Sequence, residues 1–210
     1  MIILKGKKMN LTLFKIIALL VLLFFAIFIS DFRNKKGMIP LISKKIIVII
    51  KLFYCVPICV YVYVLMTINT LLVHDYIGLI LTSVGTILVA KAKIDIGGYH
   101  TWAGHKLHST KMITKGIYGF IRHPIYTGIF IFIFGALFAN INKGPLYLAV
   151  MVIIILIFSM TFLAMMAQKE TKFLHKEFGD EFLKYQQQVH PFLPLRKYKC
   201  GESMVARSPN

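Results

Sequence analysis

Arg122, His123 and Pro124 stand together between two apolar runs, and their side chains could bind a ligand. Pro124 disfavours helix at the preceding residue and suits the first position of a helix, so we expect a helix to begin there. Free N–H groups at a helix start attract anionic groups, and Tyr118 and Tyr126 add aromatic faces with a hydroxyl. This Arg-His-Pro corner predicts a small-molecule binding site. The same residues would also suit an interfacial membrane anchor.

The elements that must hold this corner are apolar runs. Hydrophobic residues make up 58% of the 210-residue chain and are collected into blocks. About 20 residues of helix cross a hydrocarbon core. We therefore predict an all-α integral membrane protein with about five transmembrane helices and a helical C-terminal tail in the cytoplasm. The expected spans are 11–30, 46–72, 76–90, 125–139 and 145–167.

Short polar segments separate these spans. His74 and Asp75 are expected to form a short turn before the third span, and "NINKG" (140–144) makes the last two spans an antiparallel hairpin. Gly78 and Gly85 should let a neighbouring helix approach the third span closely. No small-residue cleavage site follows the first run, so we expect an anchor rather than a signal peptide.

The chain is strongly basic, with 25 Lys and Arg against 8 Asp and Glu and a formal net charge of +17. The basic residues cluster at the ends of apolar runs, which favours a membrane surface over nucleic acid. Loops 31–45 and 91–124 and the tail carry most of them, so we expect that side to be cytoplasmic. Three lysines within the first eight residues run against this orientation.

The segment after the last span has a different composition. Five of the eight acidic residues follow residue 169, so segment 168–210 is expected to face water. Phe173, Leu174 and Phe178 recur at helical spacing and extend the last span, and Gly179 should end that helix. "DEFLKYQQQV" predicts a further short helix, which "HPFLPL" ends. We divide the chain into N-terminal membrane helices, 1–75, and a core, 76–210.

Neither a disulfide framework nor a metal site is predicted. Cys55 and Cys59 fall within an apolar run and Cys200 lies in the tail, which does not match a disulfide or zinc pattern. Three histidines of the loop are close in sequence, but no acidic residue or cysteine joins them, so we expect no metal. These histidines are His100, His105 and His108.

Two stretches carry a family resemblance. "GIYGFIRHPIYTG" (116–128) resembles the G-x-Y-x-x-x-R-H-P-x-Y-x-G signature of the isoprenylcysteine carboxyl methyltransferase and phospholipid methyltransferase family of membrane enzymes. "ETKFLHKEFGDEFLKYQQQVHPFLP" (170–194) resembles the C-terminal pattern of the same family. The two stand in the family's order with one helical hairpin between them. The resemblance covers about residues 84–195.

The resemblance implies transfer of a methyl group from S-adenosylmethionine to a lipophilic acceptor at the membrane–cytoplasm boundary. The cofactor pocket would be formed by loop 97–128, hairpin 125–167 and tail 168–210. Glu170 would hold the polar part of the cofactor, a cation that also needs apolar walls. The positions that match cofactor-binding residues of the family are Met112, Ile113, Tyr118, His123, Pro124, Ile125, Tyr126 and Glu170. The acceptor, the oligomeric state and a catalytic residue do not follow from the sequence.

Three positions depart from the family pattern. The second acid of its Glu-Glu pair is Thr171 here, and its tyrosine after Phe-Gly is Phe182. The arginine that carboxyl methyltransferases carry one turn before the cofactor glutamate is Met166. Because arginine is suited to binding a carboxylate through two hydrogen bonds, this last difference bears on the acceptor rather than on the cofactor.

Two other function classes stay open. Sterol-type reductases use NADPH and share a similar R-H-P-x-Y-x-G stretch, but with Asn and Glu where this chain has Ile125 and Ile129. A non-enzymatic membrane protein, such as a small transporter, would carry polar residues in mid-span. Lys51 is the clear candidate of that kind, and it lies near the end of a span.

Overall fold

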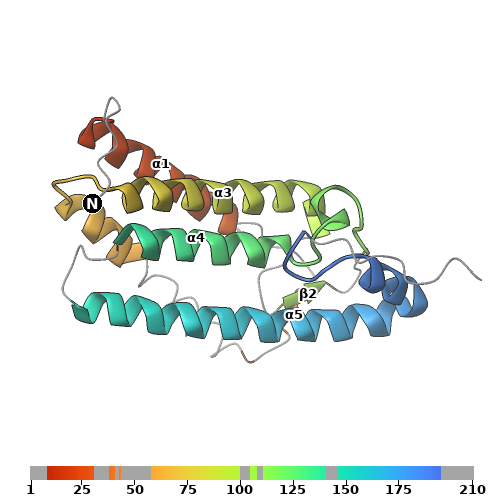
Figure 1. Cartoon of the computed structure of the whole chain (residues 1–210). Coiled ribbons are helices and arrows are strands. Elements are labelled where there is room, and N and C mark those ends of the chain that lie inside the picture. The colour runs from red at the N-terminus through yellow and green to blue at the C-terminus, as the bar shows by residue number, and fades with distance from the viewer. Residues whose placement is uncertain are drawn as a thin grey trace, which may run out of the picture.

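Helices account for most of the computed structural model (Figure 1). The main helices are α1 (Leu11–Ile29), the segment Ile58–Thr67, α3 (Val73–Ile96), α4 (Pro124–Asn140) and α5 (Leu146–Gln188). The short elements are β1 (Met38–Pro40), η1 (Gly97–Tyr99), β2 (His105–Leu107) and η2 (Gly116–Gly119), with β1 and β2 paired antiparallel. The structure describes residues 9–30, 38–40, 43, 58–99, 105–107, 111–140 and 146–194. The expected all-α fold with about five helices is confirmed.

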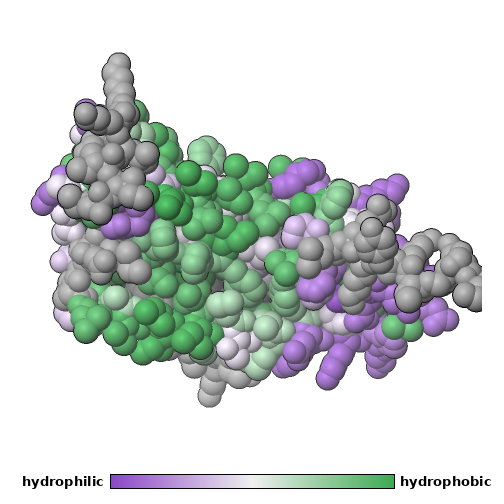
Figure 2. Space-filling view, viewed as in Figure 1, coloured by the Kyte–Doolittle hydropathy of each residue, from purple (hydrophilic) through white to green (hydrophobic). Residues whose placement is uncertain are grey.

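Three of the described helices, α1, α3 and α5, are long and apolar enough to cross a membrane. The segment Ile58–Thr67 and the apolar part of α4, Pro124–Ala139, are shorter. Up to the bend at Gly179, residues 146–178 of α5 make about 50 Å of helix at 1.5 Å per residue, more than the thickness of a hydrocarbon core. α5 is therefore longer than one membrane crossing requires. Figure 2 shows hydrophilic residues gathered mainly at the end of the molecule where α5 finishes, beyond a broad apolar surface.

The start of α3 differs from the expected boundary. His74 and Asp75 lie in the first turn of this helix and not in a turn between two spans. The carboxylate of Asp75 accepts a hydrogen bond from the backbone N–H of Leu72 at 2.7 Å. An acidic side chain at the third helical position satisfies a donor that would otherwise lack a partner, so it favours a helix that starts at Val73.

Glycines let α3 and α4 pack at close range, as the sequence predicted for Gly78 and Gly85. A Cβ atom added at Gly85 would lie 2.6 Å from the carbonyl oxygen of Gly128 on α4, and one at Gly78 would lie 2.4 Å from the Cβ of Ala139. Contacts this short leave no room for a side chain. The close packing fixes the α4 start relative to the end of α3. α1 joins the same core, where Phe25 stacks on Phe132 of α4.

The polar elements share one end of the bundle (Figure 1). The ammonium of Lys93, near the end of α3, donates to the backbone carbonyl of Ser30, just after α1, at 2.9 Å. The chain then returns through η2 into the start of α4, and α5 runs back to this end. The ends of the first and third helices and the start of the fourth therefore lie together, as the alternating spans predicted.

The helix expected to end at Gly179 changes direction there. Gly179 has φ 52° and ψ −126°, a left-handed backbone that ordinary residues rarely adopt. A short helical segment follows and ends at Gln188, as "DEFLKYQQQV" and "HPFLPL" predicted. Because of the bend, residues 189–192, which we call the strap, return to the start of α4.

Candidate functional site

The Arg-His-Pro corner is the junction between η2 and α4. α4 begins at Pro124 as predicted, and the carbonyl of His123 accepts the first helical hydrogen bond, from the N–H of Thr127 at 3.1 Å. The ring of Pro124 is fully buried. The proline therefore both sets the helix start and packs into the core, and His123 stands at the very end of α4.

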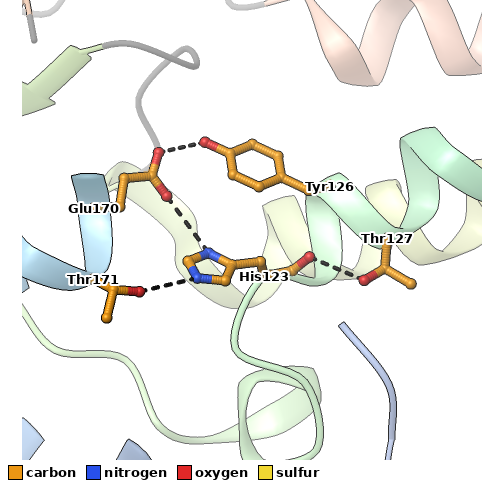
Figure 3. Close-up of polar contacts among 5 residues, drawn as sticks. All are labelled: His123, Tyr126, Thr127, Glu170 and Thr171. Atoms are coloured by element: carbon orange, nitrogen blue, oxygen red, sulfur yellow. Dashed lines mark hydrogen bonds and ion pairs between the residues drawn. The ribbon is translucent and has the colours of Figure 1, made fainter. Parts of the chain in front are cut away.

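Glu170 on α5 meets two side chains of this corner (Figure 3). The hydroxyl of Tyr126 donates a hydrogen bond to one carboxylate oxygen. Nδ1 of His123 lies 3.6 Å from the other oxygen. The His123 side chain is 8% exposed and that of Glu170 is 27% exposed. A carboxylate held by two partners at the edge of the bundle thus keeps part of its surface accessible.

Aromatic rings build the walls around this carboxylate. The rings of His123 and Tyr126 are stacked, with centroids 5.6 Å apart and planes 9° apart. The ring of Phe192 lies 5.7 Å from that of His123 and 5.9 Å from that of Phe130. A partly exposed carboxylate beside aromatic faces suits a ligand that has both polar and apolar parts.

Thr171 is a member of the site that the sequence presented only as a departure from the family pattern. Its hydroxyl lies 3.5 Å from Nε2 of His123 (Figure 3). Both ring nitrogens of His123 therefore face a polar group of α5, Glu170 on one side and Thr171 on the other. A neutral hydroxyl at this position contacts the histidine without adding a second negative charge.

Tyr118, on η2, is buried within reach of the same carboxylate. Burial, and then the negative charge of Glu170, raise the pKa of the Tyr118 phenol well above its usual range. Its backbone carbonyl accepts a hydrogen bond from the hydroxyl of Tyr185, on the last turns of α5, at 2.7 Å. The predicted site residues Tyr118, His123 and Tyr126 thus lie near Glu170, and Pro124 is buried next to His123 in the chain.

The expectation of free N–H groups at the corner is wrong for Arg122 and His123. The backbone N–H of Arg122 donates to the carbonyl of His190 at 2.9 Å, and that of His123 donates to the next strap carbonyl at 2.9 Å. The first pair belongs to a parallel bridge between Ile121 and His190. The tail therefore takes up donors that an anion would otherwise bind. Burial also lowers the pKa of the Arg122 guanidinium. The group stays cationic because the ordinary pKa of arginine lies far above neutral pH.

The other predicted site residues make no hydrogen bond or ion pair with the Glu170 carboxylate among the described residues. Ile125 packs against the hydrophobic core. Met112 and Ile113 are half-buried in the segment before η2, and no hydrogen bond among the described residues joins them to Glu170. Met166, one turn before Glu170, is 2% exposed in the core. His100 and His108 lie outside the described residues, and His105 falls in β2.

Two residues that sequence reasoning did not single out support the site. The carboxylate of Asp95, at the end of α3, accepts a hydrogen bond from the N–H of Ile117 at 2.7 Å and pairs with Lys91 at 2.5 Å. It thereby fixes η2. Nδ1 of His190, in the strap, is buried and has no hydrogen-bond partner among the described residues. Asp95 could have been noticed as one of only three acids before residue 169.

Fold and site together define a helical membrane protein with a polar site at one end of its bundle. The chain matches the family model described as phospholipid methyltransferase over residues 73–181, which is more than half of its length, and it belongs to that family. The matched region begins where α3 begins and includes both the Arg-His-Pro corner and Glu170.

Two curated rice proteins are also similar to the chain. Both are named "Probable protein-S-isoprenylcysteine O-methyltransferase", one from Oryza sativa subsp. indica and one from subsp. japonica. Each is 30% identical to it over 123 residues, which is 58% of this chain and 61% of the rice protein. The chain thus spans less than two thirds of the relatives that it matches.

Proposed function

We propose that the protein transfers a methyl group from S-adenosylmethionine to a lipophilic acceptor where the membrane meets the cytoplasm. The observation that carries this proposal is the meeting of Glu170 with His123 and Tyr126. These residues come from the two stretches that resemble the methyltransferase family. Membership of the phospholipid methyltransferase family and the names of the rice relatives support the same activity.

The side chains at the site fit the chemistry of this cofactor. S-adenosylmethionine has hydroxyl and amino groups, a positively charged sulfur and an aromatic base. Glu170 offers a partly exposed carboxylate, and the buried Nδ1 of His190 has no hydrogen-bond partner within the described part of the chain. An unpaired buried polar atom is costly unless a ligand or water satisfies it. Tyr126 and Phe192 offer aromatic faces. The proposed cofactor-binding residues are Met112, Ile113, Tyr118, His123, Pro124, Ile125, Tyr126 and Glu170.

The work of the protein in this reaction is orientation. When bound, S-adenosylmethionine supplies a methyl group that its sulfonium makes electrophilic. Glu170 would hold polar groups of the cofactor, and Tyr126 and His123 would keep that carboxylate in place. The apolar surface of α3, α4 and α5 would admit the acceptor from the lipid side. Alignment of two bound reactants supplies a large part of the acceleration in such transfers.

The arrangement of the helices fits a multi-pass membrane protein. We assign residues 76–210 to the methyltransferase core and residues 1–75 to additional membrane helices. Loop 91–124 and the C-terminal tail would face the cytoplasm, because basic residues are enriched there. A water-soluble cofactor would then reach Glu170 from the cytoplasm and a lipid acceptor from the bilayer.

A titration of the purified full-length protein, reconstituted in lipid nanodiscs, tests this function. Calorimetry should show saturable binding of S-adenosylmethionine and none of NADPH. The opposite preference would identify a reductase of the sterol type, and the absence of binding by either would favour a non-enzymatic membrane protein. NADPH carries negatively charged phosphates, whereas S-adenosylmethionine has no phosphate and carries a cationic sulfur. The comparison therefore separates a methyltransferase from a reductase without knowledge of the acceptor.

A further inference from the structure

Arg122 is occupied by the strap rather than by the carboxylate of Glu170. Its side-chain Nε donates a hydrogen bond to the carbonyl of Val189 at 3.0 Å. Its backbone N–H donates to the carbonyl of His190 at 2.9 Å. One residue of the corner therefore holds two successive carbonyls of the tail.

The contacts continue along the whole strap. The N–H of His123 donates to the carbonyl of Pro191 at 2.9 Å, and the hydroxyl of Thr127 donates to that of Phe192 at 3.0 Å. Each of the four strap carbonyls thus accepts a hydrogen bond from the corner or the first turn of α4. A segment without regular secondary structure keeps a defined position in this way.

The Val189 carbonyl depends on the arginine side chain. Val189 is buried and Arg122 is half-buried. A buried carbonyl that loses its donor leaves an unsatisfied acceptor, and a charged donor makes a stronger bond than a neutral one. Removing the guanidinium should therefore loosen the first residue of the strap.

The position of the strap also determines the surroundings of His123. Phe192, the last strap residue, places its ring beside that of His123. His123 also contacts Tyr126, Glu170 and Thr171. If the strap moves, His123 loses an aromatic neighbour and the backbone hydrogen bond to Pro191. The geometry of His123 against Glu170 is thus coupled to the tail.

We propose that Arg122 is a positioning residue, which holds the strap on the corner and thereby sets His123 against Glu170 without itself touching the cofactor. The strap contact does not depend on the proposed function, whereas its effect on cofactor affinity does. The tail has a second attachment, the hydrogen bond from Tyr185 to the carbonyl of Tyr118. Loss of the Arg122 side chain should therefore loosen the strap at Val189, its first residue, and leave the preceding helix docked.

The first measurement is amide hydrogen exchange of the full-length protein in nanodiscs without ligand. Arg122→Met keeps the length of the side chain and removes its donors, and Arg122→Lys keeps a cationic donor without the guanidinium fork. Lys115→Met is the matched control, because this exposed residue precedes η2. In Arg122→Met, peptides that cover 119–123 and 186–194 should exchange about tenfold faster, the scale of one charge-assisted hydrogen bond. Arg122→Lys should be intermediate, and peptides of α3 should not change.

The second measurement is the affinity of the same variants for S-adenosylmethionine. We expect Arg122→Met to bind about tenfold more weakly, Arg122→Lys to recover part of the loss and Lys115→Met to bind like the wild type. Unchanged exchange in both Arg122 variants would overturn the strap contact. Faster exchange with wild-type affinity would overturn the positioning role. If Arg122→Met also speeds exchange in α3, the variant is destabilised beyond the strap. The Arg122→Lys variant then tests both the strap contact and the positioning role. If the wild type binds no S-adenosylmethionine, the proposed function fails, and the exchange result still shows whether Arg122 holds the strap.

Discussion

Tyr126 and Glu170 are 44 residues apart in the chain, and the phenol hydroxyl of the first donates a hydrogen bond to the carboxylate of the second. The bond joins the first turn of α4 to the part of α5 where the apolar run ends. It places a negative charge at the boundary between the apolar bundle and its polar end. An acidic side chain at such a depth is expected to have partners and a function.

The charge of Glu170 should be needed for cofactor binding. Glu170→Gln keeps the shape of the side chain and removes the charge, so we expect the affinity for S-adenosylmethionine to fall by about 1.5–3 kcal/mol, the scale of a charge-assisted hydrogen bond. Calorimetry of the reconstituted protein measures the change. Glu177→Gln is the control, since Glu177 is exposed on the same helix. Equal affinity of the two variants would reduce Glu170 to a residue of a solvated helix surface.

The hydroxyl of Tyr126 should act through Glu170. Tyr126→Phe removes one neutral donor, and we expect a smaller loss of affinity, about 0.5–1.5 kcal/mol. The two changes should not be additive, because residues in one hydrogen bond couple. A double-mutant cycle with Glu170→Gln measures this coupling, and Tyr147→Phe, at an exposed position on α5, controls for loss of a phenol. Strict additivity would mean that the tyrosine does not orient the carboxylate.

Pro124 should matter for ligand binding more than for membrane insertion. The ring is fully buried at the first position of α4. Alanine there loses packing and the fixed φ angle, and we expect a destabilisation of about 1–2 kcal/mol. The variant should enter the membrane fraction at wild-type yield and bind S-adenosylmethionine more weakly. Poor insertion together with normal binding by the inserted fraction would instead identify the corner as an anchor.

Gly116 should be needed to keep η2 in place. It has φ +63°, and a Cβ atom there would lie 2.2 Å from a carboxylate oxygen of Asp95. Gly116→Ala should cost about 1–3 kcal/mol in stability from the backbone conformation alone. Gly98→Ala is the matched control, because no residue that the structure describes lies within 4 Å of its added Cβ. Thermal unfolding in the same detergent should show a lower Tm for Gly116→Ala than for Gly98→Ala. Equal Tm values would show that the loop adapts.

The sequence predicted most helices and the main members of the site for clear physical reasons. Apolar runs of helical length identify α1, α3 and the first half of α5, and proline and glycine mark the start of α4 and the bend at Gly179. Family resemblance supplied the pairing of the corner with Glu170. Helical periodicity alone would not have shown that these segments meet.

The strap and the start of α3 could not be predicted in the same way. The strap is held through its backbone carbonyls. Every residue carries such a carbonyl whatever its side chain is, so no sequence pattern marks the strap. Asp75 was expected in a short turn before the third span, yet its carboxylate caps the helix. Both differences come from hydrogen bonds to the backbone, which composition and periodicity do not reveal.

The nature of the acceptor is the remaining prediction, and it depends on Met166. A carboxylate acceptor must be desolvated beside the membrane, and arginine is the residue suited to holding it through two parallel hydrogen bonds. This chain has at that position a methionine that is 2% exposed among core side chains. Lys169 is exposed one turn further on, and Nε of Arg122 is already bonded to the strap. Met166 and Lys169 carry no guanidinium, and one donor of the Arg122 guanidinium is already used by the strap.

We therefore expect a neutral or amine-bearing lipophilic acceptor to be methylated in preference to a prenylcysteine carboxylate. The name of the rice relatives points to the opposite preference, which makes the comparison decisive. The assay is methyl transfer from labelled S-adenosylmethionine to a prenylcysteine analogue, beside a panel of amine, phenol and thiol lipids. Met166→Arg is a useful second variant. If recognition of a carboxylate lacks only this arginine, the variant should methylate the prenylcysteine analogue about tenfold faster or more. That factor corresponds to the free energy of a charge-assisted hydrogen-bonded pair. Saturable methylation of the prenylcysteine carboxylate by the wild type, ahead of the rest of the panel, would show that the acceptor is bound by residues other than that arginine.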